Sequence, residues 1–161
     1  MKWIKTALVM LALGLSFNAF AALSDDDEAE YREALLGGDV KVVDKYIKAD
    51  PTLKEMKFFG WSPVQMAANA NQLEVVKYLV AKGVDLNYIQ PNAHHSAFHL
   101  AAFNRFKEMT ALLAKSGANV NEKLKGDVSL IRYFRDEGDK EMQAYLTQLG
   151  VKDDGCEDKC F

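Results

Sequence analysis

Three histidines lie close together in the middle of the chain and are the first residues to consider for chemistry. His94 and His95 precede Ser96, and His99 follows within five positions. Neighbouring imidazoles can bind a metal ion or titrate near neutral pH. Adjacent residues on an ordered loop tend to point apart, however, and this stretch contains no acidic residue that would complete a metal site. We therefore expect no bound metal, and we expect this loop to be an exposed polar tip that contacts a partner.

Two cysteines, Cys156 and Cys160, form the second candidate pair, within the last six residues of the sequence. In an exported protein two cysteines this close most often form a disulfide. The alternatives are a redox-active or metal-binding pair, an intermolecular bond, or free thiols. Redox pairs usually have the spacing C-x-x-C in a thioredoxin-like α/β domain, and neither condition is met here. The sequence favours a disulfide that orders the tail.

Composition and the remaining motifs argue against catalysis and against nucleic acid. The patterns H-E-x-x-H, G-x-S-x-G and G-x-x-x-x-G-K-[ST] do not occur after the N-terminal signal, so we expect no enzyme activity and no cofactor. Apolar residues make up 49% of the 161 residues and charged residues 27%, as in a globular protein. Without Lys2 and Lys5 of the signal, 18 basic residues remain against 23 acidic ones, a net charge of −5. Phosphate backbones are poor partners for such a surface.

The N-terminus has the three parts of a secretory signal. Lys2 and Lys5 precede an apolar run over 7–17, and Ala19 and Ala21 form an A-x-A site. We expect cleavage after Ala21, which removes residues 1–21, with the next bond as the alternative. A membrane anchor is the competing interpretation, but the apolar run of about a dozen residues is shorter than the roughly 20 needed to span a bilayer. We expect no membrane attachment after cleavage.

The rest of the chain repeats itself with a period of 33 to 34 residues. Three pairs of identical residues recur 34 positions apart, namely Ala67 and Ala101, Gly83 and Gly117, and Asn87 and Asn121. Weaker copies flank these two units, upstream around Ala34-Leu35 and downstream around Ser129-Leu130. End units of a stack are expected to diverge because each presents one polar face to water. The period places four repeats near 28–56, 57–89, 90–123 and 124–151.

Each repeat is predicted to be a pair of helices. Ser62 can cap a helix that starts at Pro63, where the missing amide hydrogen costs nothing, and Gly83 can end the second helix in the left-handed conformation. A similar cap, Ser24, precedes an acidic helix start near the N-terminus. The second helix places Leu73, Val76, Leu79 and Val80 on one stripe. Since one pair cannot bury its apolar face alone, the pairs must stack.

These motifs resemble the ankyrin repeat over residues 31–151. The segment 60–68 reads Gly-Trp-Ser-Pro-Val-Gln-Met-Ala-Ala where the family has G-x-T-P-L-H-x-A-A, and 73–79 matches the second helix of the family. The resemblance implies an all-α solenoid of about four helix-pair repeats with short β-hairpin loops, over 22–151, followed by a tail over 152–161. It also implies that His99 is a structural hydrogen-bonding group, with Gln65 in its place one repeat earlier.

The resemblance further implies which side chains bind a partner, since the family uses its hairpin tips and the positions after the Ala-Ala pair. One of two adjacent rings, Phe58 or Phe59, could instead fold back over the first repeat. The third unit departs from the family pattern by having Ala97 where the second has Pro63, so we expect a looser helix start there. The predicted partner-binding residues are Phe58, Phe59, Trp61, Asn69, Asn92, His95, Phe103 and Asn104.

The function implied by the resemblance is the binding of another protein in the periplasm, by a chain that is a monomer when free. Two more specific roles are suggested by exported bacterial proteins of this kind. One is an immunity protein that neutralises an antibacterial toxin. The other is an accessory factor for an exported enzyme such as a catalase. A tight one-to-one complex would favour the first role, and sensitivity to peroxide after loss of the protein would favour the second.

Overall fold

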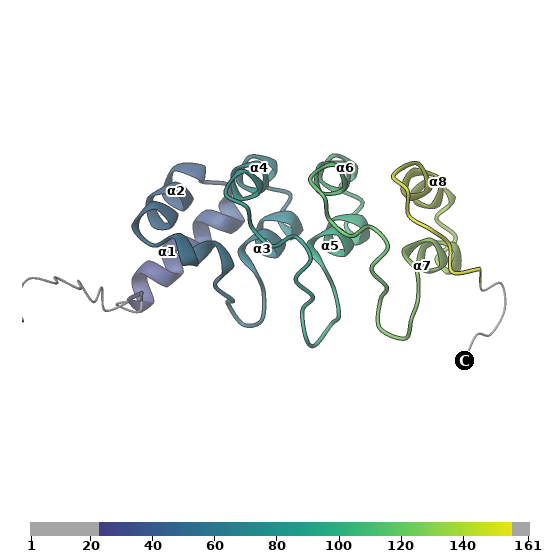
Figure 1. Ribbon diagram of the computed structural model, residues 1–161, viewed down its shortest axis with the longest axis horizontal. Helices are drawn as coiled ribbons and strands as arrows, with labels where there is room; N and C mark the ends of the chain where they lie inside the picture. Colours follow the sequence, from purple (N-terminus) through teal and green to yellow (C-terminus); the bar gives the residue numbers. More distant parts are fainter. Residues whose placement is uncertain (1–22, 156–161) are drawn as a thin grey trace, which may run out of the picture.

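Four helix pairs follow one another in a row (Figure 1). The computed structural model describes residues 23–155. One layer contains the first helix of each pair and a second layer the other, and long loops project from the first layer (Figure 1). The elements are α1 (Asp25–Gly37) and α2 (Val40–Ala49), the 3₁₀ helix η1 (Pro51–Glu55), α3 (Pro63–Asn69) and α4 (Leu73–Ala81), α5 (Ala97–Phe103) and α6 (Lys107–Lys115), and α7 (Leu130–Asp136) and α8 (Lys140–Gln148).

The predicted all-α solenoid is confirmed, and its loops are simpler than hairpins of two strands. Among the described residues the β pairing consists of two isolated antiparallel bridges, Phe58 with Trp61 and Leu124 with Val128. Helix side chains add further bonds to the loops, since Gln65 and His99 each bind a loop carbonyl.

A serine caps the first helix of every pair, as the sequence predicted for Ser24 and Ser62. The Ser62 hydroxyl accepts from the Gln65 amide, and the Gln65 side chain accepts from the Ser62 amide, which is a complete capping box. Helix α5 starts at Ala97 after the same box, built by Ser96 and His99. The missing proline therefore does not shift the helix start, because the cap supplies the orienting hydrogen bonds.

The core differs in one respect from the predicted stripe on the second helix. In α4, Val75, Val76 and Leu79 are buried, while Leu73 and Val80 are only half-buried. Helix α4 contacts both its own partner α3 and the preceding α2. A helix placed between two neighbours buries a broader face than a single stripe.

Buried polar side chains tie the second and third units together. Gln65 Nε2 donates to the carbonyls of Tyr88 at 3.0 Å and of His95 at 2.8 Å. His99 Nδ1 accepts from the Ser96 amide at 3.1 Å, so Nε2 carries the proton and donates to the Glu122 carbonyl at 3.0 Å. The structural role predicted for His99, and the replacement of His by Gln65, are confirmed.

Burial decides the charge state of His99. The pKa of His99 is lowered from 6.5 to about 4, chiefly by removal from water and to a smaller extent by His95 and His94, against the opposing effect of the Glu122 carbonyl. The imidazole is therefore neutral at pH 7, as its acceptor role toward Ser96 requires.

Candidate functional site

The surface formed by helices α3, α5 and α7 and the loops that precede them is called the inner face here. Its centre is a group of aromatic side chains from three segments. The Phe103 ring centroid lies 4.9 Å from that of His95 and 4.8 Å from that of Tyr133. Tyr133 in turn packs edge-on against the buried Phe134 at 5.0 Å. These three rings, His95, Phe103 and Tyr133, are half-buried. They offer solvent a contiguous aromatic surface across the third and fourth pairs.

His95 is fixed in this group through its backbone. Its carbonyl accepts from the amide of Gln90 at 3.0 Å and from Gln65 Nε2 at 2.8 Å. Partial burial lowers the pKa of His95, and the adjacent His94 lowers it further. The imidazole is thus neutral at pH 7 and behaves as an aromatic surface more than as a cation.

Two asparagines link the ends of helices α3 and α5. The Asn104 side-chain amide donates to Asn69 Oδ1 at 3.0 Å and to the Leu100 carbonyl at 2.9 Å. Both side chains are exposed, so they retain hydrogen-bonding capacity toward water or a partner. The structure thereby brings together four residues of the predicted site, Asn69, His95, Phe103 and Asn104.

The first hairpin separates the two adjacent phenylalanines. Phe58 is only 3% exposed and lies edge-on against Tyr31, with ring centroids 5.8 Å apart. The assignment of Phe58 as a partner-binding residue is therefore wrong, because its ring completes the core of the first unit. Phe59 is 84% exposed at the tip, and Trp61 is half-buried at the base of the turn. One of the two rings folds back, as the alternative interpretation allowed.

Other site residues lie apart or were missed. Asn92 is exposed in the loop that precedes α5, outside the aromatic group. Tyr133 was missed, and the repeat register gave no signal for it, because its counterparts Leu100 and Met66 are a buried and a half-buried residue. Arg32 was missed too, and its guanidinium lies 5.2 Å from the centroid of the Phe59 ring. No local pattern links Arg32 to a tip 27 residues away.

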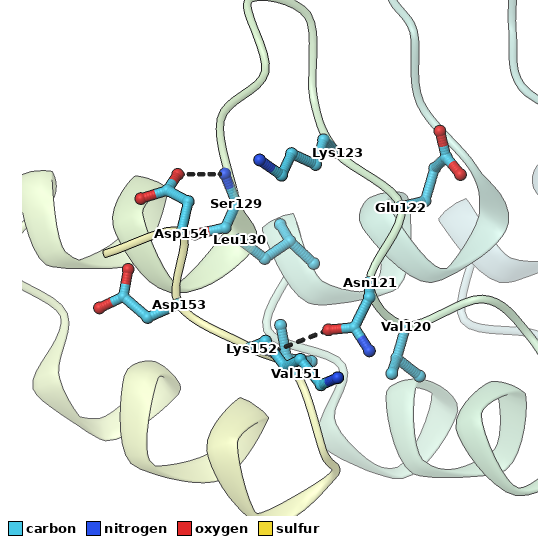
Figure 2. A pocket seen from close by; sticks show the side chains of 10 residues that line it. All are labelled: Val120, Asn121, Glu122, Lys123, Ser129, Leu130, Val151, Lys152, Asp153 and Asp154. Carbon is cyan, nitrogen blue, oxygen red and sulfur yellow. Dashed lines mark hydrogen bonds between the residues drawn. The ribbon is translucent and has the colours of Figure 1, made fainter. Parts of the chain in front are cut away.

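A groove of about 230 Å³ lies at the C-terminal end of the stack, between the loop 120–123 and the segment 151–154 (Figure 2). Its walls are bonded to each other. Asp154 accepts from the Ser129 amide at 2.9 Å, and the Lys152 amide donates to Asn121 Oδ1 at 2.8 Å (Figure 2). Ligand pockets for small molecules usually occupy about 300–1,000 Å³. This groove is smaller, and its polar groups serve the stack itself.

At the fourth helix pair, Asp154 supplies the acceptor for the serine cap that Gln65 and His99 supply in the inner units. The residue three positions after the cap is here Arg132, which can only donate. Asp154 supplies the acceptor for the Ser129 amide and lies 3.9 Å from the Arg132 guanidinium, with both side chains largely buried. The end of the stack is therefore closed by an acid–base pair where the inner units use one neutral side chain.

Neither a metal centre nor a membrane span is found between residues 23 and 155. No three His, Cys, Asp or Glu side chains gather there closely enough to hold an ion. None of the helices in this range has the length and apolarity to cross a bilayer.

A second, wider hollow of about 490 Å³ between His94 and the loop 121–127 is lined mainly by polar side chains. The predicted signal over 1–21 and the predicted disulfide between Cys156 and Cys160 lie outside the described residues.

The model of the ankyrin-repeat family matches residues 31–123 as three copies, which is more than half of the chain. The chain belongs to the ankyrin-repeat family. The fourth pair, α7 and α8, lies beyond the matched residues and continues the row (Figure 1). An ankyrin repeat domain from Acinetobacter baumannii has a similar structure, with a TM-score of 0.65 and 27% identity, covering 76% of this chain and 64% of that one.

The chain spans only a small part of the length of the curated relatives that it matches. Alpha-latrotoxin-Lg1a of Latrodectus geometricus is 26% identical over 93 residues, which are 57% of this chain and 7% of the toxin. Ankyrin repeat, SAM and basic leucine zipper domain-containing protein 1 of Notamacropus eugenii is 23% identical over 119 residues, which are 71% of this chain and 25% of the relative. Ankyrin repeats are general protein-interaction modules and are generally not enzymes.

Proposed function

We propose that this protein is an exported binding module of the periplasm that recognises one partner protein through its inner face and hairpin tips. The single observation that carries the proposal is the aromatic group of His95, Phe103 and Tyr133 on that face. Aromatic side chains anchor many protein interfaces, since they bury a large area at a small entropic cost. Their rings are only half covered by the stack, so a partner can bury the remainder.

The neighbouring polar groups suit an interface of the same kind. The amides of Asn69 and Asn104 lie exposed at the ends of α3 and α5. Interfaces combine a central aromatic patch with a hydrated polar rim. The inner face has both parts within one rigid row of helices, so a partner meets a preformed surface.

The proposal is tested by adding one arginine to either side of the same helix pair. Asn69→Arg places a long charged side chain on the inner face, and Ala81→Arg places it at an exposed position of α4. We expect quantitative affinity capture from periplasmic extract to lose its main interactor with Asn69→Arg and to retain it with Ala81→Arg. Matching circular dichroism and unfolding curves control for folding. Equal recovery with both variants would contradict the proposed face.

Export has its own test. Intact-mass measurement of protein from the periplasmic fraction should give a chain that starts at Ala22 or, after cleavage of the next bond, at Leu23. A full-length chain retained in the cytoplasm would refute the proposed location.

A further inference from the structure

The tip of the first hairpin has an unusual backbone. Phe58 and Trp61 exchange both backbone hydrogen bonds, each 2.9 Å long, across a two-residue turn. The two turn residues have positive φ angles, 53° at Phe59 and 83° at Gly60. Turns of this kind favour Asn-Gly, because both central residues must adopt the left-handed region. A bulky residue at the first position costs conformational energy that an asparagine would largely avoid.

The position of Phe59 carries small residues in the other loops. In the repeat register that aligns Trp61 with His95 and Val128, Ala93 and Gly126 occupy the place of Phe59. Phe59 is also 84% exposed, whereas the other exposed large apolar residue of the described chain, Leu36, is 45% exposed. Neither the turn nor the stack requires this ring.

The tip that holds the ring is rigid. Phe58 anchors one side in the core, and the hydroxyl of Tyr88, in the segment between α4 and α5, donates to the Gly60 carbonyl at 3.1 Å. On the ring itself, the Arg32 guanidinium lies 5.2 Å from the Phe59 centroid, and Arg32 is oriented by Glu28 at 3.6 Å. A ring held in this way loses little entropy on binding.

Two cationic side chains lie near the tip, and each has one acidic neighbour. Lys57 lies 3.6 Å from Glu55, and Arg32, beside the Phe59 ring, lies 3.6 Å from Glu28. The hairpin and helix α3 themselves, within residues 56–73, contain no Asp or Glu. Because a guanidinium carries several donors, Arg32 can pair with a carboxylate of a partner while it keeps its contact with Glu28.

We propose that Phe59, held by Arg32, is a recognition knob that inserts into an apolar pocket of the partner protein, with a carboxylate at the rim of that pocket facing Arg32. The inference rests on the proposed function and names the chemistry of the partner at this end of the face. In the free protein, the positive φ angle of Phe59 and the exposure of its ring to water are both unfavourable. Burial of the ring in the complex removes it from water and so offsets these two costs.

The first experiment tests whether the Phe59 ring stabilises the fold. Phe59→Asn puts a residue suited to the turn in its place, so the unfolding temperature should rise by about 3 °C. Phe58→Asn is the neighbouring control and should lower the unfolding temperature, because it places an amide in the core. A fall in unfolding temperature for Phe59→Asn would overturn the proposal, since it would show that the ring supports the fold.

The second experiment maps the pocket. A photo-crosslinking phenylalanine analogue, p-benzoylphenylalanine, is installed at position 59 of the full chain in living cells, and at position 36 as the control. We expect an adduct from position 59 alone, joined to an apolar pocket of the partner that is bordered by Asp or Glu. Absence of an adduct at 59, equal adducts at both positions, or a crosslink to a flat polar surface would each overturn the proposal.

A comparison of variants distinguishes this failure from failure of the proposed function. If Asn69→Arg abolishes partner capture and Phe59→Asn leaves it unchanged, the inner face stands and the knob is refuted. If both variants capture the partner as well as the wild type does, the proposed binding face is itself refuted. The knob is supported when Phe59→Asn weakens binding at least tenfold and Arg32→Gln weakens it to a smaller extent.

Discussion

The inner units and the last unit satisfy the amide of the serine cap with different chemistry. In the second and third units one neutral side chain, Gln65 or His99, accepts from the serine cap three residues earlier and donates to a loop carbonyl 23 residues later. In the fourth unit Arg132 has that position, and Asp154 provides the acceptor for the cap. The acceptor has thus moved from the helix to the segment that follows α8.

The difference shows what each arrangement demands of its surroundings. A buried neutral group needs two hydrogen bonds and no counter-charge, which suits a position enclosed by neighbours on both sides. Burying an acid–base pair costs more desolvation free energy than burying a neutral side chain. This cost is lower at the end of a row, where solvent is near, than between two neighbouring units. Variants of each connection test whether the two arrangements are equivalent.

Removal of the inner connection should have the largest effect. His99→Ala deletes the acceptor of the Ser96 amide and the donor to the Glu122 carbonyl and leaves a small cavity. We expect the free energy of unfolding to fall by about 3 kcal/mol, measured by urea denaturation. The matched variant His99→Gln copies the arrangement of Gln65 and should retain most of this stability. An equal loss in both variants would show that the two side chains are not interchangeable.

Acid should weaken the inner connection through His99. Its pKa is lowered from 6.5 to about 4 in the folded protein, so the unfolded chain takes up a proton at higher pH than the folded one. Stability is therefore fully present above pH 6.5 and is lost as the pH falls toward 4, by an amount on the order of 3 kcal/mol. Unfolding curves at several pH values should show a slope in the wild type that is largely absent in His99→Gln. Identical slopes would exclude His99 as the titrating group.

The end arrangement should contribute less and depend on its partner. Asp154→Ala removes the acceptor of the Ser129 amide and an acidic neighbour of Arg132, and should cost about 1–2 kcal/mol. In an Arg132→Gln background the same change should cost clearly less, because the glutamine can accept from Ser129 as Gln65 does from Ser62. A double-mutant cycle measures this coupling. Additive losses would mean that the two positions do not share one role.

The turns between the helices of each pair provide the smallest test. Their positive-φ residue is Gly38 or Gly138 in the end units and Asn71 or Arg105 in the inner units. Asn71→Gly should raise the free energy of unfolding by about 0.5 kcal/mol, because the strain it relieves exceeds the added entropy of the unfolded chain.

Arg105→Gly, the matched change in the third unit, should give no gain. Arg105 also bonds to Asp139 at 2.8 Å and lies 5.6 Å from the centroid of the Phe134 ring. Thermal unfolding of both variants measures the difference. A gain for Arg105→Gly as large as that for Asn71→Gly would show that these contacts contribute nothing.

Local and periodic features were predictable from the sequence. The serine caps, the start of α3 at Pro63, the left-handed Gly83 and the exchange of His99 for Gln65 all depend on residues within four positions or on a fixed period. The caps form within one turn of helix, so the local spacing specifies them, and the exchange of His99 for Gln65 follows from the fixed period. The helix pairs and their stacking follow from the same repeat.

Contacts between distant segments were decided by the tertiary structure. Two adjacent phenylalanines look alike in sequence, but the turn sends Phe58 to Tyr31 and Phe59 into solvent. Asp154 lies 22 residues after Arg132, and only the packing of the last segment on α7 brings them together. Repeats specify how neighbouring units stack and where the inner-face residues Asn69, Phe103 and Asn104 lie. The loop tips lack such a neighbour on one side. Their side chains take positions that the period does not encode, and the proposed recognition knob, Phe59, is one of them.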